Sequence, residues 1–117
     1  MTSAPVSWVA AGGAAGATLR YALGEWFPEA AGAFPWTTLA INVAGSFLLA
    51  VLLSRSPRPE VQALLGPGLL GGFTTLSAYS EQTRQLLDSG DAGLAVLYVA
   101  GTLAACLVAV ALARRVR

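Results

Sequence analysis

Residues Gly71 to Tyr79 read GGFTTLSAY and lie in the middle of an otherwise apolar segment. The glycine pair and the run of hydroxyl side chains predict a helix that breaks at membrane depth. Lipid offers no water to freed backbone groups, so irregular backbone is tolerated there only where protein, a cavity or an ion takes up the carbonyls and amides. This stretch is therefore the first candidate for a functional site.

The composition around this stretch is that of a membrane protein. Of the 117 residues, 56% are hydrophobic and 11% are charged, and the mean hydropathy is +0.65. Four apolar stretches, residues 6–23, 37–54, 61–83 and 93–113, each approach the roughly 20 residues that cross a bilayer. We expect an all-α membrane protein in which residues 1–117 form one domain of four transmembrane helices, with a break in the third.

The chain lacks the residue types on which most enzymes depend. It contains no histidine, which excludes imidazole bases and the usual Ser-His-Asp arrangement. Its single cysteine, Cys106, has no partner within the chain, and we interpret it as a small packing residue. Nothing resembles a nucleotide-binding loop. We expect no catalytic residues, no enzyme activity and no nucleic-acid partner, with membrane lipid as the surroundings.

The arginines predict how the helices are oriented. With an even number of spans, both termini and the second loop lie on one side of the membrane. The arginines on that side are Arg55, Arg58, Arg114, Arg115 and Arg117, and those on the opposite side are Arg20 and Arg84. Five arginines against two favour both termini in the cytoplasm.

Three of the expected helices carry a line of neutral polar residues. These are Thr38, Asn42 and Ser46 in the second, Ser77, Ser80 and Thr83 in the third, and Tyr98, Thr102 and Cys106 in the fourth. Hydrogen bonding between helices explains such lines in many bundles. Neutral donors also suit a weakly held anion, because they replace its hydration without trapping it. For Asn42 both interpretations remain open.

Two further features have structural and functional interpretations. Gly12 and Gly16, like Gly68 and Gly72, have the GxxxG spacing that lets helix backbones approach closely. Glu81 is the nearest candidate for a proton-relay carboxylate, but Arg84 follows at i+3, and a structural ion pair is the alternative.

Three motifs together resemble the Fluc (CrcB) family of fluoride channels. Residues 12–21, GGAAGATLRY, are similar to the family's GGxxGAxxRY opening. Residues 38–47, TLAINVAGSF, are similar to its TLxxNxxGSF segment, and residues 71–79 are similar to its GGFTTFSTF signature. The motifs occur in order, and the resemblance covers nearly the whole chain.

This resemblance implies a dual-topology dimer of two antiparallel subunits, with two narrow fluoride pathways lined by both. It implies a structural sodium ion at the dimer interface, held by backbone carbonyls of Gly71 and Thr74, and Arg20 near a pore vestibule. The implied pathway residues are Thr38, Asn42, Leu76, Ser77, Tyr79, Tyr98 and Thr102.

The chain departs from the family pattern at the positions of Leu76, Tyr79 and Gln82. The family usually has phenylalanines at the first two, and their ring edges contact fluoride; it tends to have a glutamate at the third, whereas here Glu81 stands one position earlier. Leucine offers no electropositive ring edge. The arginine bias also works against insertion in both orientations. We therefore consider pairing with a homologous, differently oriented subunit as well as with a second copy.

The resulting expectation is a multi-pass protein of the inner (plasma) membrane that lets fluoride leave the cytoplasm passively and so reduces fluoride toxicity. The alternatives are a small dual-topology transporter, a non-conducting partner subunit of a heterodimeric fluoride channel, and a non-conducting helical scaffold. A transporter needs a titratable group within the membrane, whereas a scaffold tolerates loss of the Asn42 amide.

Overall fold

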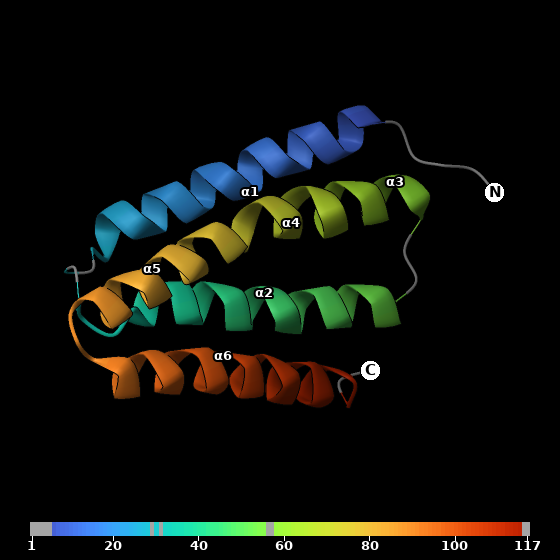
Figure 1. Cartoon of the computed structure of the whole chain (residues 1–117). Coiled ribbons are helices and arrows are strands. Elements are labelled where there is room, and N and C mark those ends of the chain that lie inside the picture. The colour runs from blue at the N-terminus through green and yellow to red at the C-terminus, as the bar shows by residue number, and fades with distance from the viewer. Residues whose placement is uncertain (1–5, 29, 31, 56–57, 116–117) are drawn as a thin grey trace.

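The computed structural model describes residues 6–28, 30, 32–55 and 58–115, and it is all-α. Its helices lie side by side in an elongated body of 50 × 29 × 25 Å. The first helix begins, and the last helix ends, at the same end of the molecule (Figure 1). This is the arrangement expected for an even number of spans.

The helices form four rods, as the sequence predicts. The first rod is α1 (Val6–Trp26), the second is α2 (Trp36–Ser54) and the fourth is α6 (Ala92–Ala113). The third rod consists of α3 (Pro59–Ala63), the π-helical segment η1 (Leu64–Leu70), α4 (Gly71–Phe73) and α5 (Leu76–Asp88). By length and composition alone, α2 and α6 are the described helices that qualify as membrane spans. The glycines and the charged Arg20 and Glu25 lower the hydropathy of α1, and the third rod is divided into short elements.

The helix ends follow from local chemistry. Pro35 precedes α2, and Pro59 is the first residue of α3, where its missing N–H costs no hydrogen bond. Asp91 caps α6 because its Oδ1 accepts a hydrogen bond from the amide of Leu94 at 3.2 Å. Gly90, with φ of 78°, makes the tight turn between α5 and α6 that an L side chain would strain.

The π-helical segment η1 contains Pro67. In an α-helix, proline lacks the N–H that would bind the carbonyl four residues back and collides with that carbonyl. The wider π-turn relieves this conflict. It ends where the amide of Gly71 donates to the carbonyls of Gly66 and Gly68, and α-helical geometry resumes in α4.

The first rod packs tightly against η1 and α4 through glycines. A Cβ added at Gly12 would lie 2.0 Å from the carbonyl oxygen of Leu64, and one at Gly16 would lie 2.0 Å from that of Leu69. A Cβ at Gly72 would lie 2.4 Å from the carbonyl oxygen of Gly13. The close approach predicted from the GxxxG spacing is confirmed.

A second contact region joins α5 to α6. Leu86, Ala95 and Tyr98 are buried together there, with Phe34 and Tyr79 packed against them. The rings of Phe34 and Tyr79 lie 5.4 and 5.1 Å from that of Tyr98. Much of the remaining surface of α6 is apolar and exposed, at Val96, Leu97, Leu103, Leu107, Val108 and Leu112. Such a surface suits lipid or another subunit.

Candidate functional site

The third rod breaks between α4 and α5. Thr74 has φ −76° and ψ 159°, and Thr75 has φ −148° and ψ 121°, so both are extended. The break lies within the stretch that the sequence singles out. It comes after the glycine pair, because Gly71 and Gly72 are themselves helical.

Asn42 of α2 holds the extended backbone of the break. Its Oδ1 accepts a hydrogen bond from the amide of Thr75 at 3.0 Å, and its Nδ2 donates to the carbonyl of Thr75 at 3.2 Å. Thr75 caps α5, since its Oγ1 accepts from the amide of Ala78 at 3.1 Å. The side chains of the break and of α2 thus replace helical hydrogen bonds.

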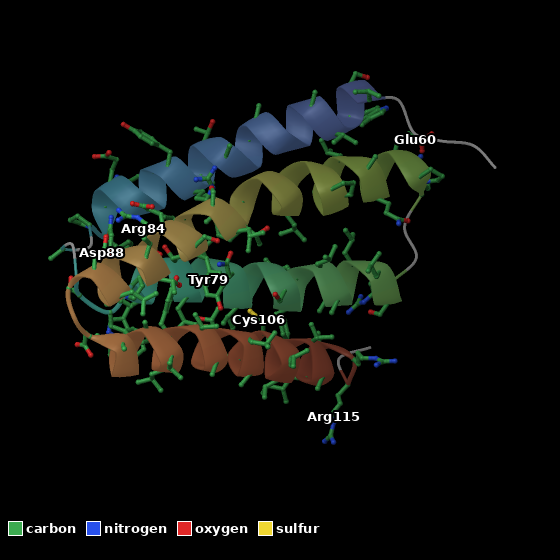
Figure 2. All side chains as sticks on the ribbon, in the orientation of Figure 1. Glu60, Tyr79, Arg84, Asp88, Cys106 and Arg115 are labelled. Carbon is green, nitrogen blue, oxygen red and sulfur yellow. The ribbon has the colours of Figure 1, made fainter. Side chains whose placement is uncertain are left out.

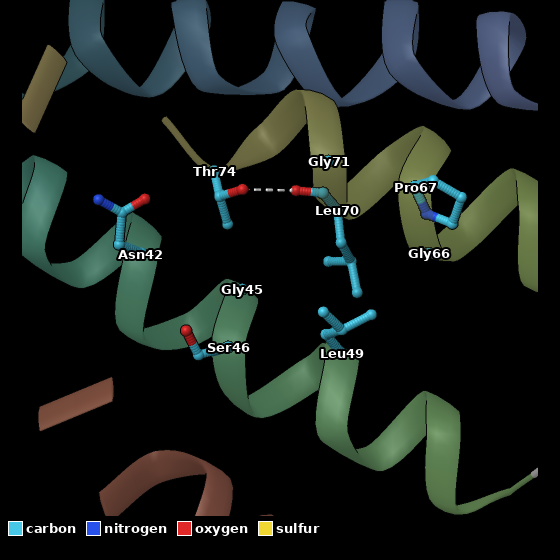
Figure 3. A pocket seen from close by; sticks show the side chains of 9 residues that line it. All are labelled: Asn42, Gly45, Ser46, Leu49, Gly66, Pro67, Leu70, Gly71 and Thr74. Atoms are coloured by element: carbon cyan, nitrogen blue, oxygen red, sulfur yellow. Dashed lines mark hydrogen bonds between the residues drawn. The ribbon is translucent and has the colours of Figure 1, made fainter. Parts of the chain in front are cut away.

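Because side chains replace these helical hydrogen bonds, two backbone carbonyls lose their helical donors. In an unbroken helix the amide of Thr75 would donate to Gly71, and that of Ala78 would donate to Thr74. Here they donate to Asn42 and to the Thr75 hydroxyl. The carbonyl of Leu70 instead accepts twice, from the amide and the Oγ1 of Thr74, each at 3.0 Å (Figure 3).

Two hollows lie beside the break and share Asn42 and Thr74. The first hollow, of about 410 Å³, is shown in Figure 3 and is lined by Asn42, Gly45, Ser46, Leu49, Gly66, Pro67, Leu70, Gly71 and Thr74. The second hollow, of about 300 Å³, is lined by Asn42, Thr74, Thr75, Leu76, Tyr79, Thr102, Leu103 and Cys106. The lining residues of both hollows are uncharged. Cys106, interpreted from the sequence as a packing residue, belongs to the second.

Thr102 is the most unusual residue of the second hollow. It is only 5% exposed, and within the described part of the chain its Oγ1 has no hydrogen-bond partner. A buried hydroxyl without a partner costs about 1–3 kcal/mol, so such groups normally have a ligand, a water or another subunit to bind. Thr102 lines the second hollow, so a polar occupant there is one candidate partner for its hydroxyl.

A third hollow, of about 330 Å³, lies toward the end of the molecule where α1 and α2 connect. It includes Arg20, Glu25, Thr38 and Gln82, and it shares Thr75 with the second hollow. Arg20 is half-buried, and its Nε donates to the carbonyl of Gly72 at 3.2 Å. The arginine therefore anchors α4 and also contributes positive charge to this hollow.

The remaining residues predicted for the pathway lie in different surroundings. Leu76 is 76% exposed at the second hollow, and the hydroxyl of Tyr79 donates to the carbonyl of Val99 at 3.0 Å. Ser77 is exposed, with its Oγ 3.3 Å from that of Thr75. Tyr98 is fully buried, and its hydroxyl donates to Oε1 of Gln82 at 3.0 Å. The structure thus brings Asn42, Leu76, Tyr79 and Thr102 together, with Thr38 in the neighbouring hollow and Tyr98 in the core.

Glu81 forms an ion pair. Arg84 binds both Glu81 and Asp88, and all three side chains are more than half exposed. Figure 2 shows Arg84 beside Asp88. The ion pair predicted for Glu81 is confirmed, and Asp88 extends it. Among the described residues, no group of three or more carboxylate, cysteine or histidine side chains is placed to hold a metal ion.

A comparison with family models gives a match over residues 7–114 to the family described as "CrcB-like protein, Camphor Resistance (CrcB)". The chain belongs to the CrcB/FluC family. Three similar FluC proteins, each named a fluoride-specific ion channel, come from Thermus thermophilus, Novosphingobium aromaticivorans and Streptomyces coelicolor. Their identities to this chain are 47%, 48% and 42%, over 81%, 85% and 96% of it and 79%, 84% and 77% of their own lengths.

Membership of the CrcB/FluC family makes this an all-α membrane protein of a channel family and not an enzyme. Two residues of this FluC-family site were missed in the sequence, Thr75 as the partner of Asn42 and Gln82 as the partner of Tyr98. Thr75 could have been found, because threonine is common at the N-cap of a helix, where its hydroxyl accepts a hydrogen bond from the backbone amide three residues later. The Gln82 contact crosses from α5 to α6 and has no local signal.

Proposed function

We propose that this CrcB/FluC-family chain is a subunit of a fluoride channel through which fluoride leaves the cytoplasm passively, which reduces its toxicity. The observation that carries the proposal is the buried, unpartnered Thr102 hydroxyl in a hollow beside the break. A hydroxyl in that position supplies a hydrogen bond to an anion that has lost its water. The three FluC relatives named above support fluoride as that anion.

The three hollows support a route for the ion. The third hollow shares Thr75 with the second, and the second shares Asn42 and Thr74 with the first. Arg20 offers a guanidinium to anions in the third hollow, beside the carboxylate of Glu25, and neutral donors then take over. Because the second hollow contains no lysine or arginine, the ion is bound weakly enough to leave.

The same lining argues against a proton-coupled transporter. The first and second hollows contain no aspartate or glutamate among their lining residues. Glu81 is exposed and paired with Arg84. A transporter driven by protons depends on a titratable group at membrane depth, and these two hollows offer none.

The functional unit that we propose is an antiparallel dimer with two pathways. One subunit leaves the second hollow flanked by exposed side chains, with Leu76 76% and Leu103 61% exposed. A second subunit packed over this face would enclose the hollow and exclude water and lipid. The dimer would be embedded in the plasma membrane as a multi-pass protein.

A sodium ion at the dimer interface fits the chemistry of the break. The carbonyls of Gly71 and Thr74 lose the helical amides that would bind them, and oxygen atoms of this kind bind hard cations. Carbonyls from two subunits would complete the oxygen ligands. In this role sodium is structural, and fluoride is the ion that permeates.

Residue identity at Leu76 favours a second candidate function, a non-conducting partner subunit in a heterodimer. Leu76 lines the second hollow with an aliphatic side chain, where family resemblance implies a ring. Arg55 follows α2, Arg58 precedes α3, and Arg114 and Arg115 follow α6. These helix ends lie at one end of the molecule (Figure 1), and the bias favours one orientation in the membrane. A homologue of opposite orientation would then supply the conducting residues.

Growth of a fluoride-sensitive bacterium that lacks its own fluoride exporter tests the proposal. Expression of this chain should restore growth in fluoride medium, and the Thr102→Val variant, expressed at the same level, should restore it only at lower fluoride concentrations. Rescue by both forms up to the same fluoride concentration would contradict the assignment of Thr102 to the pathway. Failure of both, with the protein present in the membrane, would favour the partner-subunit alternative.

A further inference from the structure

A groove separate from the three hollows lies between α2 and α6. It has a volume of about 420 Å³ and is lined by Ala50, Leu53 and Ser54 of α2, by Val110 of α6 and by Arg114 directly after α6. We call it the arginine groove. It shares no lining residue with the hollows beside the break. The proposed fluoride route therefore leaves this groove without a function.

Positive charge gathers at this end of the molecule. Arg55 directly follows α2, and Arg114 and Arg115 directly follow the last helical residue of α6. Within the described part of the chain, the ion pairs all involve Arg84, at the opposite end of the molecule from Arg115 (Figure 2). The guanidinium of Arg114 is exposed and has no carboxylate bound to it among the described residues.

The position of these arginines along the helices matters. Both α2 and α6 are apolar enough to cross a membrane, so residues just after their ends lie at the level of the lipid headgroups. Basic pockets between transmembrane helices bind anionic lipid headgroups, and guanidinium binds phosphate oxygens in a bidentate manner. The C-terminal ends of α2 and α6 carry partial negative charge and repel an anion here, so an anion binds only if the arginine supplies positive charge.

Apart from Ser54, the rest of the groove is apolar. Ala50, Leu53 and Val110 form its walls, and the small side chain of Ala50 leaves space between the helices. The hydroxyl of Ser54 donates to the carbonyl of Val51 at 2.8 Å, so it is not the donor for a phosphate. The groove thus has the positive charge of Arg114 at one end and an apolar wall along the rest of its length. This combination matches a phospholipid with a net negative charge.

We infer that the arginine groove binds one anionic phospholipid per subunit. The phosphate lies against the guanidinium of Arg114, and part of an acyl chain lies along Ala50, Leu53 and Val110. In an antiparallel dimer the two grooves open toward opposite leaflets, so each leaflet supplies one lipid. The inference requires a membrane-embedded subunit and is independent of which ion the protein conducts.

Native mass spectrometry of the full chain tests this site, with phosphatidylglycerol as the anionic lipid and phosphatidylcholine of the same acyl chains as the neutral one. Arg114→Gln should weaken phosphatidylglycerol binding about fivefold, the loss expected for one arginine at a membrane surface. Arg115→Gln is the matched control, because Arg115 is also exposed and does not line the groove. It should change binding less than twofold.

Ala50→Leu, which fills the groove and leaves every charge in place, should also weaken phosphatidylglycerol binding; Ala50→Val replaces it if the leucine variant does not fold. Equal losses in the Arg114 and Arg115 variants would overturn the inference, since the basic end would then attract lipid diffusely. Three other outcomes would overturn it as well. The Ala50 variant could bind phosphatidylglycerol as the wild type does, or the two lipids could bind equally. The wild-type protein could also bind no lipid because a second copy covers the groove.

Discussion

Asn42 binds both backbone groups of Thr75, accepting from its amide at 3.0 Å and donating to its carbonyl at 3.2 Å. One side chain of α2 therefore supports the extended turn that divides the third rod. Asn42 also lines both hollows beside that turn. The two interpretations that the sequence leaves open for Asn42, structural and functional, are thus compatible.

Replacement of Asn42 by alanine should destabilise the fold and abolish conduction together. It removes two hydrogen bonds and leaves the Thr75 amide without its acceptor, at a cost of about 2 kcal/mol in the free energy of unfolding. Unfolding in a denaturing detergent, followed by circular dichroism, and fluoride efflux from liposomes measure the two effects.

Ser46→Ala is the matched control for Asn42→Ala, because Ser46 lies one turn further along α2 and lines the same first hollow. It should leave the free energy of unfolding nearly unchanged. An Asn42→Ala protein with wild-type stability and wild-type efflux would show that the contact with Thr75 is dispensable.

Replacement of Thr102 by valine should separate conduction from stability. The Thr102 hydroxyl has no partner in the described part of the subunit, so an isosteric apolar side chain should leave the stability unchanged or raise it. Loss of one hydrogen bond to the ion, about 1–1.5 kcal/mol, should slow fluoride efflux about tenfold.

Thr102→Ser, which keeps the hydroxyl, should restore most of the efflux lost in Thr102→Val. Thr83→Val serves as the stability control, because the Thr83 hydroxyl already donates to the carbonyl of Tyr79 at 2.8 Å. A fall in the stability of Thr102→Val with no change in efflux would indicate that the hydroxyl only packs against a neighbour.

Replacement of Leu76 by phenylalanine should raise the fluoride efflux rate severalfold if this subunit conducts. The side chain is 76% exposed at the second hollow and has room to present a ring edge, which is electropositive and attracts anions. Leu87→Phe, an exposed position on the same helix, is the control. A lower rate in Leu76→Phe with a normal rate in Leu87→Phe would mean that leucine is the better residue here.

The four rods and their ends could be predicted because their causes are local. Apolar length gives the rods, and Pro35 and Pro59 mark where two helices begin. The π-helical segment around Pro67 could not be placed in the same way. Proline predicts a disturbance of the helix, but the choice between a kink and a π-turn depends on how closely η1 packs against α1.

The site was predicted in part. Asn42 and Thr102 were recognised as polar residues in apolar helices, and the structure brings them to one hollow. The break has a different cause from the one that the glycine pair indicates. The glycines allow close contact with α1, whereas Thr75 and Asn42 form the break itself. The burial of Tyr98 depends on Gln82 and Phe34, which belong to other elements, so no pattern within α6 reveals it.

Replacement of Gly12 by alanine should strongly destabilise the subunit. The added Cβ would lie 2.0 Å from the carbonyl oxygen of Leu64 and 2.7 Å from the amide nitrogen of Leu69, both backbone atoms that cannot move aside easily. We expect a loss of about 3 kcal/mol in the free energy of unfolding, at the upper end for overpacking.

Gly24→Ala, in the same helix, is the control for Gly12→Ala. No atom lies within 4 Å of a Cβ added at Gly24, so alanine should stabilise α1 by about 0.5–1 kcal/mol through its higher helix propensity. Two substitutions of the same kind would thus have opposite signs. Similar changes in both proteins would contradict the close packing of α1 on the third rod.

Efflux from liposomes that contain only the purified chain shows whether this chain conducts fluoride. Fluoride and chloride are compared at the same protein density, with protein-free liposomes as the baseline. We expect rapid fluoride efflux with chloride efflux at the baseline. Folded protein that releases neither ion, or releases both equally, would contradict a fluoride channel built from this chain alone.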